Sequence, residues 1–158
     1  MIQRIQSVFL LLLALAMLSV LVLPIWSKTD PLTGQEVVLS AYKLAFTNPQ
    51  PGSPAPTPTY LIAILALISA VVAVYEIFQF KTRFRQLKIG LLNFLLIVAT
   101  IGAGFYYSGV GEQLLNIKVP GEFEAGFYLP TLALLLNVLA NRFIRRDEQL
   151  VRSMDRLR

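Results

Sequence analysis

Four apolar stretches, each about as long as a membrane-spanning helix, constrain this chain more than any other feature of its sequence. They cover residues 5–26, 60–80, 89–107 and 125–144. A helix rises 1.5 Å per residue, so about twenty apolar residues cross the roughly 30 Å hydrocarbon core of a bilayer. Only 15% of the residues are charged, against roughly 25% in soluble domains. The sequence therefore predicts an all-α membrane protein, a single domain over residues 1–158 built as a bundle of four transmembrane helices.

The basic residues predict how these helices are oriented. Of the 14 Lys and Arg residues, eleven lie before the first stretch, between the second and third, or around the end of the fourth. Lys and Arg accumulate on the cytoplasmic side of membrane proteins, so both termini are predicted to be cytoplasmic. The loops follow from this orientation: outer loops at 27–59 and 108–124, an inner loop at 81–88 and a cytoplasmic tail at 145–158.

The first outer loop contains signals for a little β structure. Asp30-Pro31-Leu32-Thr33-Gly34 is typical of a turn, and residues 36–44 are rich in strand formers. We expect a short strand there, with a hairpin to residues 25–28 as one possibility. Residues 48–58 contain five prolines and predict an extended or disordered spacer. Pro24 and Trp26 are interpreted as the end of the first span at the outer interface, where Trp is favoured.

Glu76 is an acidic residue within an apolar stretch, about one turn from its cytoplasmic end. An ionisable group at mid-membrane costs about 2.5–3.5 kcal/mol, so it is a candidate functional site. The other spans place amides at a similar depth, which predicts a polar patch in which Glu76 pairs with Arg142, Lys81 or an amide. One interpretation is a proton or cation site, and the other is hydrogen bonding between helices, worth roughly 0.6 kcal/mol per bond. The predicted patch comprises Glu76, Asn93, Asn137, Asn141 and Arg142.

The last residues predict that the fourth span continues as an amphipathic cytoplasmic helix. Phe143, Leu150, Met154 and Leu157 recur along one face. This helix would either lie on the headgroups, with its arginines attracting anionic lipid, or bind a cytoplasmic partner or a second copy. The candidate contact residues are Arg145, Arg146, Leu150, Arg152, Met154 and Arg156.

Alanines line one face of the second span. Ala63, Ala66, Ala70 and Ala73 are spaced by three or four residues, which predicts close packing against a neighbouring helix. Packing within the bundle is the expected use of this face, and a homodimer is the alternative.

The composition limits the chemistry that the chain could support. The sequence has no Cys and no His, which removes thiolate ligands, cysteine nucleophiles and the commonest general base. No phosphate loop, catalytic pair or metal cluster can be recognised, so no cofactor is expected. The basic residues adjoin apolar stretches and do not form a basic face of a folded domain, which argues against nucleic-acid binding.

The two ends of the chain resemble a known family. The opening Met1-Ile2-Gln3-Arg4-Ile5-Gln6 and the close from Asp147 to Arg158 are similar to a bacterial family known as domain of unknown function 4293. This resemblance covers essentially the whole chain and implies an inner-membrane protein with four predicted spans. It supplies no activity or ligand, but it suggests that the cytoplasmic ends are important.

These observations favour a non-enzymatic scaffold or accessory subunit that acts through its cytoplasmic tail. The alternative is a small transporter or channel component that uses Glu76 and the nearby asparagines. A membrane enzyme is disfavoured, because it would have to work with carboxylates, amides and tyrosines alone.

Overall fold

The computed structural model describes residues 2–79, 82–115 and 118–155, with side chains given except at 2–4, 83 and 150–155. These residues form helices and short strands in an order that places the first four strands between the first two helices. The elements are α1 (Ile2–Ser19), β1 (Trp26–Thr29), β2 (Glu36–Leu39), β3 (Lys43–Phe46), β4 (Thr57–Pro58), α2 (Tyr60–Phe78), α3 (Arg83–Glu112), β5 (Glu122–Phe123) and α4 (Ala125–Asp155).

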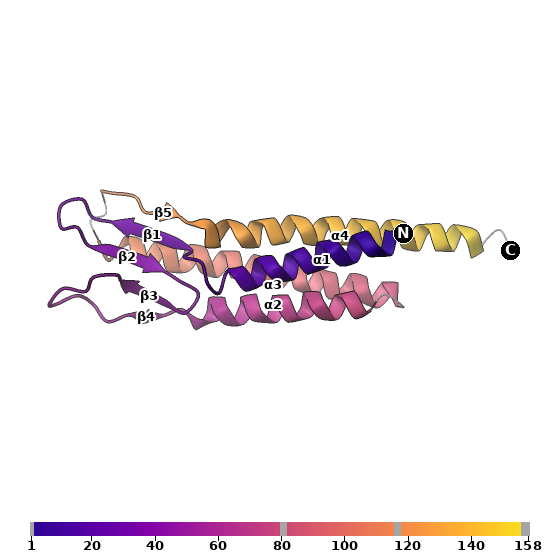
Figure 1. Ribbon diagram of the computed structural model, residues 1–158, viewed down its shortest axis with the longest axis horizontal. Helices are drawn as coiled ribbons and strands as arrows, with labels where there is room; N and C mark the ends of the chain where they lie inside the picture. Colours follow the sequence, from indigo (N-terminus) through magenta and orange to yellow (C-terminus); the bar gives the residue numbers. More distant parts are fainter. Residues whose placement is uncertain (1, 80–81, 116–117, 156–158) are drawn as a thin grey trace.

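The helices lie side by side, and the strands gather at one end of them (Figure 1). α1 contacts α2 and α4, and α3 contacts the same two helices, so the cyclic order is α1–α2–α3–α4. Consecutive helices run in opposite directions, and so do α1 and α4 (Figure 1). We call the end of the helices opposite the strands the far end.

The interior between the helices combines large residues from α1 with small residues from α2. Leu13 and Met17 of α1 are completely buried. The alanine face of α2 is also buried, which confirms the packing expected from its spacing; its members are Ala63, Ala66, Ala70 and Ala73. Small side chains let neighbouring backbones approach closely.

Three helices are long and apolar enough to cross a membrane: α2, α3 from Phe84, and α4 as far as Gln149. Helix α1 is shorter. The predicted first span of residues 5–26 is therefore too long, because α1 ends at Ser19 and the chain has entered β1 by Trp26. Pro24, which cannot donate a backbone hydrogen bond, lies in the connection between them.

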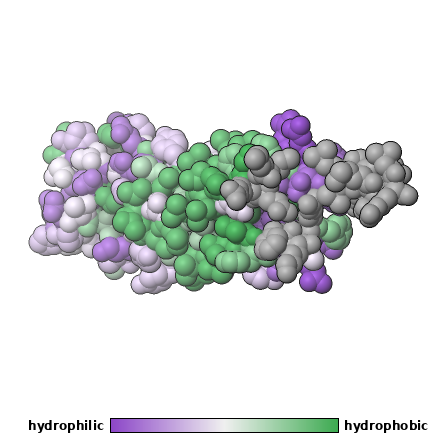
Figure 2. Space-filling model, turned by 45° about the vertical axis from the view of Figure 1, so that its right-hand side comes forward, coloured by the Kyte–Doolittle hydropathy of each residue, from purple (hydrophilic) through white to green (hydrophobic). Residues whose placement is uncertain are grey.

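The outward surface of the helices is apolar. Leu15 of α1, Ile64 of α2, Leu95 of α3 and Leu135 of α4 are each more than half exposed. Figure 2 shows hydrophobic residues covering the middle of the molecule, with mostly hydrophilic residues at the end that holds the strands. An apolar surface of this extent is typical of a protein surrounded by lipid.

The predicted all-α class is wrong, because the strands form a five-stranded antiparallel sheet. Its order is β4-β3-β2-β1-β5. The hairpin of β1 and β2 occurs where one was considered possible, with Trp26 opposite Leu39 and Thr29 opposite Glu36. Its turn is the predicted one: Gly34 has a φ of +67°, and Asp30 accepts hydrogen bonds from the Leu32 backbone and the Thr33 hydroxyl.

Two features of the first outer loop add strands to the sheet, and β5 from the second outer loop adds another. The single strand predicted at 36–44 is divided by a turn, in which Ser40 donates to and accepts from the Lys43 backbone. The proline-rich spacer also ends in a strand, since β4 pairs with β3 through Leu44 opposite Thr57 and Lys43 opposite Pro58. Proline is tolerated in β4 because that strand lies at the edge of the sheet.

The helices also extend further than the predicted spans. Helix α3 begins at Arg83, within the predicted inner loop of 81–88, and ends at Glu112 rather than near residue 107. Its 30 residues correspond to about 45 Å at 1.5 Å per residue, so the helix outruns a hydrocarbon core of roughly 30 Å. Helix α4 continues without a break from Ala125 to Asp155, as the pattern of its last residues predicted.

Candidate functional site

Polar side chains of α2 and α3 meet in two layers towards the far end. Ser69 Oγ donates to Asn93 Oδ1 over 2.6 Å, and Gln86 Nε2 donates to the backbone oxygen of Glu76 over 3.2 Å. Ser69 and Glu76 are seven residues apart, as are Gln86 and Asn93, so each pair lies on one face of its helix. The antiparallel arrangement brings these two faces together.

The predicted asparagines of α4 contribute a second polar pair. Asn141 Nδ2 donates to Asn137 Oδ1 over 2.6 Å. Gly90 of α3 packs directly on this pair, since a Cβ atom built there would lie 2.3 Å from Asn141 Oδ1. Of the five predicted patch residues, Glu76, Asn93 and Asn137 are buried, Asn141 is half-buried and Arg142 is exposed.

Glu76 is completely buried, and its carboxyl group is not paired as expected. Neither carboxyl oxygen has a hydrogen-bond partner among the described residues. The predicted pairing with Arg142 or with an amide side chain is therefore wrong, and Lys81 lies outside the described residues. The backbone carbonyl of Glu76, by contrast, accepts hydrogen bonds from the Gln86 side chain and from the Gln79 N–H.

Gln6 of α1 joins this region, although the sequence did not single it out. It is buried, and its Nε2 has no partner among the described residues. Phe9 stacks on Phe143 with ring centroids 5.6 Å apart. Three contacts fix the relative heights of the antiparallel helices: Phe9–Phe143, Gly90–Asn141 and Gln86–Glu76. Counting along the helices from these contacts places Gln6 within about one residue of the level of Glu76. The available signal was a glutamine at the start of an apolar stretch, where polar side chains are rare.

The predicted contact residues of the tail are only partly described. Arg145 and Arg146 are exposed on α4 and, together with Arg142, border a groove between α3 and α4. The backbone of Leu150, Arg152 and Met154 continues the helix, but their side chains lie outside the description. Arg156 lies outside the described residues altogether.

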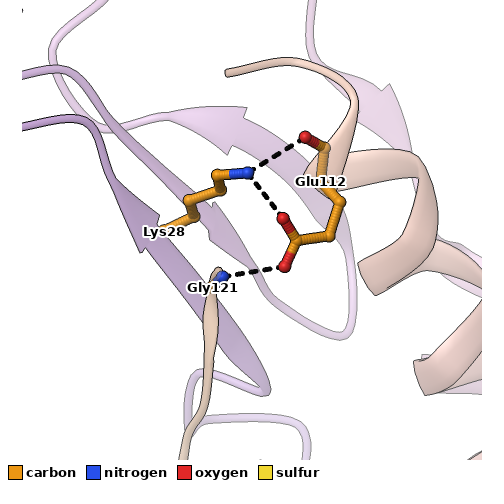
Figure 3. Close-up of polar contacts among 3 residues, drawn as sticks. All are labelled: Lys28, Glu112 and Gly121. Atoms are coloured by element: carbon orange, nitrogen blue, oxygen red, sulfur yellow. Dashed lines mark hydrogen bonds and ion pairs between the residues drawn. The ribbon is translucent and has the colours of Figure 1, made fainter. Parts of the chain in front are cut away.

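A second polar site joins the sheet to α3, and the sequence did not predict it. Lys28 of β1 extends its ammonium group to Glu112, the last residue of α3 (Figure 3). Its Nζ lies 2.5 Å from Glu112 Oε2 and 3.1 Å from the Glu112 backbone oxygen. The other carboxylate oxygen accepts from the Gly121 N–H over 2.8 Å. The side chain of Lys28 is 0% exposed and that of Glu112 is 36% exposed.

The surroundings of this ion pair explain its position. Lys28 follows Trp26 by two residues, so strand alternation directs both towards α3. Trp26 is buried against two glycines, where an added Cβ atom would lie 2.5 Å from the ring at Gly111 and 2.2 Å at Gly121. A lysine at the C-terminus of a helix is also favoured by the helix dipole. The interpretation of Trp26 as the end of the first span is therefore wrong, because it is a buried residue of β1.

The environment of Glu112 shifts its acidity. Burial raises the pKa of this carboxyl group, but the hydrogen bonds from Lys28 and Gly121 and the charge of Lys28 together lower the pKa below its ordinary value of 4.5. Glu112 therefore remains a carboxylate under mildly acidic conditions. The group lies beside the sheet, past the apolar part of α3.

Comparison with known proteins identifies a family but no activity. The model of the family described as Domain of unknown function (DUF4293) matches residues 2–157. No curated protein and no solved structure matches the chain. The resemblance noted at the two ends of the sequence is thus confirmed over nearly its whole length.

Proposed function

The chain belongs to the DUF4293 family, and from this premise we propose that it is a non-enzymatic protein of the bacterial inner membrane. In this proposal it scaffolds or assists a partner protein through the cytoplasmic end of α4. Three helices that are long and apolar enough to cross a membrane support the location. The excess of Lys and Arg near the far end supports placing that end in the cytoplasm. We include α1 as a fourth, shorter span, since its 18 residues reach about 27 Å.

The observation that carries the proposal is the projection of α4 beyond the other helices (Figure 1). Counting from the contact of Gly90 with Asn141 places the first residue of α3, Arg83, level with residue 148 of α4. Helix α4 continues to Asp155, which is about two further turns. A helix that leaves its neighbours while remaining continuous offers a surface on which another protein can pack.

The test compares the full chain with a chain that ends at Gln149 and with a control that lacks only residues 157–158. Each is purified from membranes in mild detergent after crosslinking, with the amount of inserted chain matched. The proposal predicts a specific partner with the full chain and the control, and its loss from the chain ending at Gln149. The same partners with all three chains, or none with any, would contradict the proposal.

A specific observation also favours a second candidate, a proton or cation carrier centred on Glu76. Burial of an unpaired carboxylate costs several kcal/mol, and both oxygens of Glu76 lack partners among the described residues. A bound proton or cation would relieve this cost. In vesicles with the purified chain, Glu76→Gln should abolish ion or proton flux while the exposed outer control Glu122→Gln retains it. Equal flux in the two variants, or no flux in the native chain, would eliminate this candidate.

A further inference from the structure

A groove between α3 and α4 combines an apolar wall with a strongly basic end. Its volume is about 710 Å³. The wall consists of Leu91, Phe94 and Val138, of which Leu91 is 61% and Val138 50% exposed. The groove becomes basic towards the far end of the helices, where its lining is formed by Arg142, Arg145 and Arg146.

The three arginines act as one cationic surface. Residues 142, 145, 146 and 149 are related by helical spacings of three, four and seven, so they share one face of α4. Asp147 falls on the opposite side of the helix at 100° per residue, where it makes contacts of its own. None of the three guanidinium groups makes a hydrogen bond or ion pair with another group in the described part of the chain. Their donors are therefore available to a ligand that enters the groove.

The order of the lining along the helix axis specifies an amphipathic ligand. Gly90 lies against Asn141, so Leu91 and Phe94 are level with residues 140 and 137 of α4. The arginines begin about one turn beyond the middle of this wall and continue for a second turn. A ligand that fits must place hydrocarbon against α3 and an anionic group one to two turns towards the far end.

We propose that this groove binds an anionic phospholipid, with its phosphate held by Arg142, Arg145 and Arg146 and an acyl chain along Leu91, Phe94 and Val138. Guanidinium groups match phosphate oxygens in geometry as well as in charge. The apolar wall adjoins the exposed hydrophobic surface of the same helices, since Leu95 and Leu135 lie about one turn from Leu91 and Val138 and are more than half exposed. Lipid can therefore reach the groove laterally from the bilayer. Basic pockets between membrane helices bind anionic headgroups in this way. The inference requires the membrane location but not the partner role of α4.

The experiment titrates the purified chain in detergent with dioleoyl phosphatidylglycerol or dioleoyl phosphatidylcholine and counts bound lipids by native mass spectrometry. The groove variant is Arg142→Gln/Arg145→Gln. The matched control is Arg85→Gln/Lys88→Gln, which removes two exposed charges from the same end of α3 without changing the groove. These substitutions lie on the surface, and circular dichroism checks that the helices are retained.

The expected result is tighter binding of phosphatidylglycerol than of phosphatidylcholine, weakened about 30-fold in the groove variant and less than about 3-fold in the control. The 30-fold change corresponds to about 1 kcal/mol for the direct contact of each of the two arginines with the phosphate, which the control residues do not make. Equal losses in the two variants, or no preference between the lipids, would overturn the proposal. Displacement of the lipid by millimolar inorganic phosphate would overturn it too, because the site would then recognise the free anion.

The result is separable from the test of partner binding. The chain that ends at Gln149 retains every residue of the groove, so it should bind phosphatidylglycerol as the full chain does. Loss of lipid binding in that chain would show that residues 150–158, rather than the groove, hold the lipid, and would also overturn the inference.

Discussion

Replacing Lys28 with methionine should weaken the attachment of the sheet to α3 without disturbing the helices. Methionine preserves most of the apolar stem of lysine but removes both hydrogen bonds to Glu112. A hydrogen bond to a charged group contributes about 1.5–3 kcal/mol, and breaking a fully buried ion pair costs about 3–5 kcal/mol. Because Glu112 is 36% exposed and keeps its bond from Gly121, water compensates for part of this loss. We expect the free energy of unfolding of the sheet to fall by about 2–3 kcal/mol.

The assay uses the intrinsic fluorescence of Trp26. This residue is the one tryptophan of the chain and lies buried in the same strand as Lys28. Its emission during urea unfolding in detergent therefore reports on the sheet. The matched control is Lys43→Met on β3, an exposed lysine in the same sheet, which should change the free energy of unfolding by less than about 0.5 kcal/mol. Equal effects of the two substitutions would refute the assigned role of the Lys28–Glu112 pair.

Two further predictions concern other contacts. The pKa of Glu112 is lowered in the folded chain, so its contribution to stability is complete above the ordinary value of 4.5. That contribution is lost as the pH falls through the lowered pKa, so the Trp26 unfolding midpoint should decline below pH 4.5, and decline less in Glu112→Gln. Gly90→Ala should lower the melting temperature in detergent, because its Cβ would displace Asn141 at a cost of about 1–3 kcal/mol. Gly102→Ala in the same helix has open space around its Cβ and should be neutral or stabilising; equal effects of the two would contradict this packing.

The helices could be predicted from the sequence because each is encoded locally. Apolar residues over about twenty positions define α2, α3 and α4, and the spacing from Ala63 to Ala73 identifies the buried face of α2. The turn at Asp30 to Gly34 is equally local. These features depend on neighbours within a few residues, which is the range over which sequence patterns are informative.

The sheet and its attachment depend on contacts between distant residues. β5 has two residues and pairs with β1 across nearly a hundred positions, and Lys28 meets Glu112 across 84. A strand of two residues has no periodicity of its own, so β4 and β5 could not be recognised. Strand alternation could have indicated that Lys28 lies on the same buried side as Trp26, but not which carboxylate it meets.

The sequence identified the polar residues towards the far end as a group, but it did not predict which side chains pair with one another. Glu76, Asn93 and Asn137 were chosen because polar groups are rare in apolar helices, and all three are buried. Their partners depend on the relative rotation and register of the helices. Ser69 therefore pairs with Asn93, while Arg142 faces outward and contributes to the groove instead.

Sidedness of labelling in intact cells tests most directly whether the helices cross the membrane with the sheet outside. The chain has no cysteine, so Ala55→Cys in the exposed proline-rich segment and Gln149→Cys on α4 each introduce a unique thiol. In bacterial spheroplasts, a membrane-impermeant maleimide should label Ala55→Cys at once and Gln149→Cys only after the membrane is disrupted. Labelling of Gln149→Cys in intact spheroplasts, or recovery of the chain in the soluble fraction without detergent, would contradict the proposed membrane topology.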